Sequence, residues 1–171
     1  TFFGLQMYLK RYLSKPITTA DIDEAESYII PHGTPFNRKG WEGIVNKYGG
    51  YLPIEITALP EGTVHNGGVP EIQVRSPDPD YVWLGSYLET PILRATWYPS
   101  TVASVSRSIK KDILHYLNMT SDTPTAELPF KLHDFGARGV SSKESAGIGG
   151  VAHLVNFIGT DTLEALRYAR R

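Results

Sequence analysis

The sequence predicts an α/β fold in which an α+β region, residues 1–127, leads into two βα units, residues 128–171. Two apolar-rich runs, residues 130–135 and 154–158, each stop at a glycine, as strands that end in a loop commonly do. A helical segment separates the two runs. This alternation of strands and helices is typical of parallel βαβ units.

The first helix of these units is predicted to begin near Ser142. Ser141 stands three residues before Glu144, the spacing at which the two side chains satisfy free N–H groups at a helix start. The chain opens without a methionine and closes on a helical run, residues 163–171, with no cap after it. A complete eightfold barrel takes about 250 residues, so we expect the chain to be a segment of a longer protein.

Residues 1–127 are predicted to form helices around a small antiparallel sheet. Thr18 and Asn37 stand at cap positions before helical segments that end ahead of Pro31 and at Gly49. Short stretches that are extended, or that alternate apolar and polar side chains, predict the strands. The expected strands are residues 54–58, 62–65 and 72–75, the expected further helices are residues 81–93 and 101–117, and the expected linker is residues 120–127.

The composition is that of an ordinary globular protein, with 171 residues, 41% hydrophobic residues and a net charge of −1. The chain has no cysteine, which excludes a disulfide scaffold, a thiolate zinc site and a cysteine nucleophile. We expect no nucleic-acid partner, because no basic stripe is present, and no membrane partner, because no apolar run approaches spanning length. A cytoplasmic location is expected, and the five histidines show no metal-ligand spacing.

Three side chains follow the predicted strands: Phe135, Arg138 and Asp161. Ligands of parallel sheets and barrels gather at the carboxyl ends of strands, so these three are candidates for binding. The simpler alternatives are a core phenylalanine, a surface arginine and a helix-capping aspartate. His133 lies inside the first predicted strand, where a hydrogen-bonded core histidine is more common than a catalyst.

Two familiar motifs fail on their context. Asp134-Phe135-Gly136 spells the magnesium triplet of kinases, but no glycine-rich strand pair precedes it. Gly147-Ile148-Gly149 fits a dinucleotide fingerprint by letter but falls inside a helix. We expect these glycines to permit close helix packing instead.

The chain resembles the nicotinamide phosphoribosyltransferases, in the pyridine-base branch of the type II phosphoribosyltransferases. The resemblance is carried by the segment from Lys131 to Ser142, by Gly159-Thr160-Asp161-Thr162 and by shorter motifs along nearly the whole chain. It implies a small α+β domain leading into an incomplete (β/α) barrel, in a homodimer whose subunits share the active site. It also implies transfer of phosphoribose from 5-phosphoribosyl-1-pyrophosphate to nicotinamide in NAD salvage, with Mg²⁺ and, as an activating cosubstrate, ATP.

The resemblance also implies roles for four substrate-binding residues. Phe135 would stack on the pyridine ring, Arg138 would reach the carbonyl of the base and the phosphate side of the nucleotide, and His133 would line the inner end of the base tunnel. Asp161 stands where nicotinamide-specific members carry aspartate. A carboxylate there accepts hydrogen bonds from a carboxamide and repels the carboxylate of nicotinate. No catalytic residue is assigned within the segment.

The sequence departs from the family at Ala137, where a tyrosine often stands. The loops that bind the phosphoribosyl donor and its magnesium, the histidine phosphorylated by ATP and the aromatic donated by the partner subunit all fall outside residues 1–171. We therefore expect this segment alone to be inactive and the intact protein to be active. Two alternatives stay open: a nicotinate phosphoribosyltransferase, and a non-catalytic binding or signalling protein that retains the fold.

Overall fold

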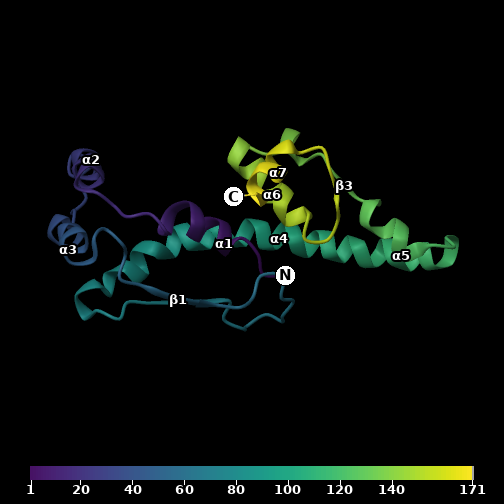
Figure 1. Ribbon diagram of the computed structural model, residues 1–171, viewed down its shortest axis with the longest axis horizontal. Helices are drawn as coiled ribbons and strands as arrows, with labels where there is room; N and C mark the ends of the chain where they lie inside the picture. The colour runs from purple at the N-terminus through teal and green to yellow at the C-terminus, as the bar shows by residue number, and fades with distance from the viewer. Residues whose placement is uncertain (171) are drawn as a thin grey trace. The chain divides into compact units, whose positions relative to one another are not determined.

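The computed structural model describes residues 1–170, which combine helices with two short sheets (Figure 1). Contacts within the chain group residues 1–7, 59–71 and 91–170 into one compact unit, called unit 1, and residues 8–58 and 72–90 into a second, called unit 2. The predicted domain division at residue 127 concerns the barrel of a longer protein and stays a prediction.

Unit 2 contains α2 (Thr19–Ile29) and α3 (Arg38–Tyr48), both capped as predicted. Thr18 and Asp21 form a reciprocal capping box at the start of α2. Asn37 Oδ1 accepts the Gly40 N–H at 3.1 Å at the start of α3. Gly49 ends α3 in the left-handed conformation, with φ of 61°, which glycine adopts without steric cost.

The sheet of unit 2 pairs β1 (Glu55–Ala58) with β2 (Ile72–Arg75) in antiparallel register, from Glu55 opposite Arg75 to Ala58 opposite Ile72. The predicted strand at residues 62–65 is wrong. The Gly62 N–H donates to the carbonyl of Phe2, and the Phe2 N–H donates to Thr63, so this segment bonds to the N-terminal residues instead.

A single long helix, α4 (Trp83–Thr120), replaces the two helices predicted on either side of Pro99. A proline inside a helix removes one hydrogen bond and crowds the preceding turn. Here the cost is offset by packing, because Pro99 is fully buried and Gly4 lies against its ring, where an added Cβ would come within 2.4 Å. Burial of the Pro99 ring therefore outweighs the tendency of proline to end a helix.

Unit 1 carries the second sheet, in which β3 (His133–Asp134) pairs in parallel with β4 (Gly159–Thr160). Parallel pairing was predicted, but β3 is shorter than the predicted run 130–135, and β4 begins only after the second predicted run, 154–158. Residues 154–158 are not a strand, because the N–H groups of Val155 and Asn156 bond back to carbonyls of the preceding helix. The run is apolar because it includes the fully buried Phe157.

The helix between these strands, α6 (Lys143–His153), is followed after β4 by α7 (Leu163–Ala169), against which it packs (Figure 1). Ser142 caps α6 by accepting the Ser145 N–H at 3.0 Å, one residue later than the predicted Ser141–Glu144 box. The remaining short helices are α1 (Leu5–Tyr8), η1 (Leu9–Leu13), η2 (Pro79–Tyr81), α5 (Pro124–Glu127), η3 (Leu128–Phe130) and η4 (Gly136–Arg138).

The glycines of α6 permit close packing, as predicted. A Cβ on Gly150 would stand 2.5 Å from the Cβ of Ala165 in α7, whose methyl group has no freedom to move aside. We expect Gly150→Ala to lower the free energy of unfolding by about 1–3 kcal/mol, the usual cost of overpacking. Urea unfolding of the protein measures this.

Gly85, in α4, is the matched control, because a Cβ there would meet no atom within 4 Å. Gly85→Ala is expected to stabilise the protein by about 0.5–1 kcal/mol, since alanine restricts the unfolded chain more than glycine does. Equal effects of the two substitutions would contradict the close approach of α6 and α7.

The core of unit 2 is bordered by an ionic cluster. Asp78 accepts hydrogen bonds from Lys47 Nζ at 2.6 Å and from the Tyr48 hydroxyl at 2.5 Å, and its side chain is only 13% exposed. The hydrogen bonds from Lys47 and Tyr48 lower the pKa of Asp78 to about 2, and the bond to Asp78 raises the pKa of Tyr48.

An acidic side chain whose pKa is lower in the folded chain than in the unfolded chain stabilises the fold at any pH above its unfolded-state pKa. This stabilisation is lost as the pH falls through the folded-state pKa. For Asp78 this loss is expected as the pH falls from the ordinary pKa of the side chain, 3.8, to its pKa in the folded chain, about 2. Asp78→Asn should therefore flatten the fall in the free energy of unfolding between pH 4 and pH 2. Urea titrations across this range test the prediction, and an unchanged pH slope would contradict it.

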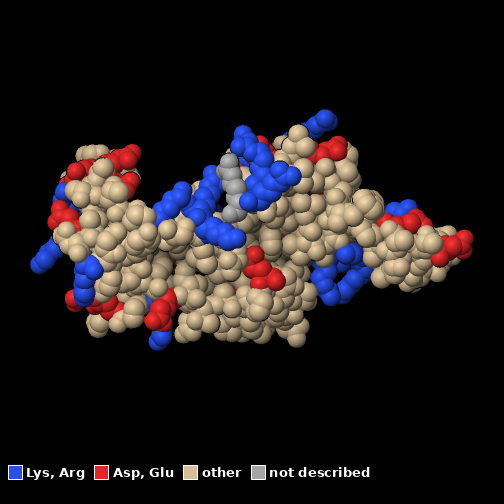
Figure 2. All heavy atoms as spheres, viewed as in Figure 1, with Lys and Arg blue, Asp and Glu red and all other residues tan. Residues whose placement is uncertain are grey.

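Most of the face drawn in Figure 2 is uncharged; its lysine and arginine side chains gather mainly near the upper middle, and its acidic side chains lie in small groups. Among residues 1–170, none of the helices combines the length and the apolar character that a membrane crossing needs.

Candidate functional site

The parallel pair β3 and β4 brings the predicted site residues of two separate loops together. His133 stands opposite Gly159, and Asp134 stands opposite Thr160. Because side chains alternate along strands, His133 and Asp161 share one face of the pair, while Asp134 and Thr160 share the other. Both sets make a direct side-chain contact across the strands.

On the first face, His133 Nε2 and Asp161 Oδ1 are 2.9 Å apart. The side chain of His133 is 40% exposed and that of Asp161 is 61% exposed. The expectation of a core histidine is therefore wrong, since His133 lies at the surface and pairs with the acid. The capping alternative for Asp161 also fails, because Thr162 is the N-cap of α7 and no side chain caps that helix.

Phe135 extends this face. Its ring centroid is 5.0 Å from that of His133, with the planes tilted by 44°, and the residue is 59% exposed. Among the described residues, Phe135 is therefore not part of the core. Phe135 and Asp161 each contact His133, so an aromatic face for stacking and a carboxylate for hydrogen bonding both lie next to this histidine.

Arg138 ends η4, the short helix that follows Phe135. The residue is exposed, and within residues 1–170 its guanidinium takes part in no hydrogen bond or ion pair with another side chain. The structure thus places it on the same loop as Phe135 without joining it to His133 or Asp161. A free guanidinium presents several donors to planar, oxygen-rich groups.

Sequence reasoning assigned no role to Asp134, which organises the loop from the opposite face. Its carboxylate accepts the Gly136 N–H at 2.8 Å and the Thr160 hydroxyl at 3.0 Å, and its carbonyl accepts the Asp161 N–H at 2.9 Å. The spacing of Asp134 and Gly136 is that of an Asx turn, a signal that could have revealed this role. Burial and then the charge of Asp134 raise the pKa of Tyr98.

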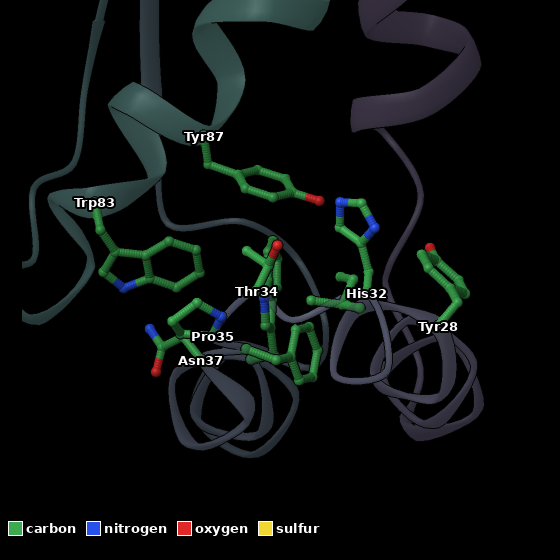
Figure 3. A pocket seen from close by; sticks show the side chains of 10 residues that line it. Tyr28, His32, Thr34, Pro35, Asn37, Trp83 and Tyr87 are labelled. Atoms are coloured by element: carbon green, nitrogen blue, oxygen red, sulfur yellow. The ribbon is translucent and has the colours of Figure 1, made fainter.

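A separate pocket of about 670 Å³ lies in unit 2 (Figure 3). Figure 3 shows Trp83 and Tyr87 from α4 on one side, with His32 and Tyr28 on another. None of the predicted site residues lines it. Within residues 1–170, no three His, Asp or Glu side chains are grouped so that they could hold a metal ion.

Two family models match the chain. Residues 1–56 match the N-terminal domain of nicotinamide phosphoribosyltransferase, and residues 130–170, which include the β3–β4 site, match the nicotinate phosphoribosyltransferase family. Both models describe phosphoribosyltransferases of pyridine bases, and the chain is similar to that class over these two segments.

Individual relatives narrow this class. The chain is 54% identical, over 99% of its length, to a nicotinamide phosphoribosyltransferase of Xanthomonas campestris pv. campestris, of which it covers 36%. It is 31% identical, also over 99% of its length, to one of Acinetobacter baylyi, of which it covers 35%. The resemblance to nicotinamide phosphoribosyltransferases is confirmed, and the chain spans about a third of the length of these relatives.

Proposed function

We propose that the protein transfers phosphoribose from 5-phosphoribosyl-1-pyrophosphate to nicotinamide, giving nicotinamide mononucleotide and pyrophosphate in NAD salvage. The observation that supports this most strongly is the carboxylate of Asp161, held 2.9 Å from His133 beside the exposed ring of Phe135. The names of the relatives support the same pentosyltransferase activity.

In this reaction the lone pair of the pyridine nitrogen forms a bond to the anomeric carbon of the donor. The bond from that carbon to the pyrophosphate oxygen breaks, the pyrophosphate takes the electron pair, and the ring nitrogen becomes positively charged. No covalent enzyme intermediate and no strong base are needed. The protein's contribution is to orient the ring and to stabilise the separated charges.

Three residues suit that task. Phe135 would stack on the pyridine ring and exclude water from one side. Asp161 would accept a hydrogen bond from the carboxamide NH₂. Arg138 would donate to the carbonyl of the base and to the phosphate side of the nucleotide. The contacts of Phe135 and of Asp161 with His133 in unit 1 support the first two of these roles.

The proposal includes the setting of the whole protein. The two βα units would open an incomplete (β/α) barrel with the site at its mouth, in a cytoplasmic homodimer whose partner subunit completes the site. Mg²⁺ would accompany the pyrophosphate of the donor, and ATP would act as an activating cosubstrate. Residues outside 1–171 would hold both.

The test is a steady-state assay of the intact protein with the phosphoribosyl donor, Mg²⁺ and either nicotinamide or nicotinate. We expect kcat/KM for nicotinamide to exceed that for nicotinate. A reversed order would favour a nicotinate phosphoribosyltransferase. An intact protein that makes neither mononucleotide would favour the non-catalytic alternative.

A further inference from the structure

We propose that His133 is a positioning residue: it holds Asp161 as an oriented hydrogen-bond acceptor and so sets how strongly the site prefers a carboxamide to a carboxylate. This inference rests on the proposed function and adds a residue that determines its specificity. His133 acts in it through Asp161 rather than on the base itself.

The hydrogen bond to His133 occupies only one of the two carboxylate oxygens of Asp161. Oδ1 of Asp161 lies 2.9 Å from His133 Nε2. Among the described residues, Asp161 Oδ2 has no hydrogen-bond or ion-pair partner. One oxygen is thus anchored to the protein, and the other remains to accept an N–H from a ligand.

The imidazole ring is itself confined on two sides. A Cβ on Gly159, directly across the strand pair, would stand 2.6 Å from His133 Nδ1, so the ring lies against bare backbone. The ring of Phe135 lies 5.0 Å away, centroid to centroid. The glycine is therefore required for the ring to take this place, and the placed ring then directs Nε2 at Asp161.

The anchor matters because Asp161 is an exposed aspartate at the end of a strand. Without a partner its side chain would rotate freely, and a bound ring would then leave its negative charge poorly solvated. A donor at Oδ1 fixes the rotamer and keeps one carboxylate oxygen hydrogen-bonded when the ligand excludes water. Both effects strengthen the bond to a carboxamide and the repulsion of a carboxylate.

The test compares His133→Leu with His133→Gln in the intact protein. Glutamine can place an N–H near the position of Nε2, whereas leucine fills the space without a donor. We expect His133→Leu to lower the ratio of kcat/KM for nicotinamide to that for nicotinate by about 10-fold, the effect of one hydrogen bond to a charged group. His133→Gln should keep the ratio within about 3-fold of the wild type.

A double-mutant cycle separates this role from direct contact with the base. If His133 acts through Asp161, His133→Leu should leave the ratio unchanged once Asp161→Asn is present. An equal further loss in that background would overturn the proposal.

Gly159→Ala tests the same contact without replacing His133 or Asp161, and it should lower the ratio because its Cβ would displace the His133 ring. Suppose that the wild type prefers nicotinamide but that His133→Leu or Gly159→Ala leaves the ratio of the two kcat/KM values unchanged. This result would overturn the inference and leave the proposed function intact. A wild type that prefers nicotinate would overturn both.

Discussion

Replacing Asp161 with serine is expected to remove most of the protein's preference for nicotinamide over nicotinate. A serine hydroxyl still forms a hydrogen bond with either base but carries no charge that repels a carboxylate. The ratio of the two kcat/KM values should fall, mainly because nicotinate becomes a better substrate.

The size of the effect depends on how well water is excluded from the site. Two like charges about 4 Å apart repel by about 1 kcal/mol in water and by about 4 kcal/mol at an effective dielectric constant of 20. Asp161 is 61% exposed in this chain, which favours the lower value, but a bound ring and the remainder of the protein would cover it. The ratio should therefore change by between about 5-fold and about 1,000-fold.

Asp161→Asn is the matched variant, because it removes the charge and keeps the shape of the side chain. It should relax discrimination about as much as Asp161→Ser does, if charge is the cause. Parallel assays with the two bases measure both variants. An unchanged ratio in both would show that Asp161 does not face the ring substituent.

Phe135→Ala is expected to lower kcat/KM for nicotinamide by between about 5-fold and 150-fold, since stacking of a base on an aromatic ring contributes about 1–3 kcal/mol. Phe135 is 59% exposed, so its loss should change the free energy of unfolding by less than about 1 kcal/mol. The variant should thus lose activity while nearly keeping its free energy of unfolding. Steady-state kinetics and urea unfolding of the same preparation measure them.

Phe130 provides the control for this experiment. It is an exposed phenylalanine of the same unit, at 65% exposure, and it ends η3 rather than following β3. Phe130→Ala removes a similar ring and should leave kcat/KM unchanged. Equal losses in the two variants would mean that stacking is not the role of Phe135.

The sequence predicted those parts of the fold that depend on local chemistry. Thr18 and Asn37 begin helices because their side chains satisfy N–H groups within three residues, and such short-range bonds can be read from spacing. The continuous α4 could not be predicted this way. Its course through Pro99 depends on burial against Gly4, a residue almost one hundred positions away.

The sequence predicted which residues form the candidate site and that they follow two strands. It did not predict which of these residues contact one another. The register that places His133 opposite Gly159 depends on pairing between distant segments, and a shift of one residue would have turned His133 away from Asp161. The exposure of His133 was missed for a related reason. The apolar residues beside it indicated a long buried strand, whereas β3 is only two residues long.

The most direct test of the account is a crystal structure of the intact protein with nicotinamide bound. We predict that the pyridine ring stacks on Phe135 and that the carboxamide nitrogen lies within hydrogen-bond distance of Asp161, whose other oxygen stays bonded to His133. Nicotinamide seated elsewhere, for example in the aromatic pocket beside Trp83 and Tyr87, or an Asp161 side chain turned to solvent, would contradict it.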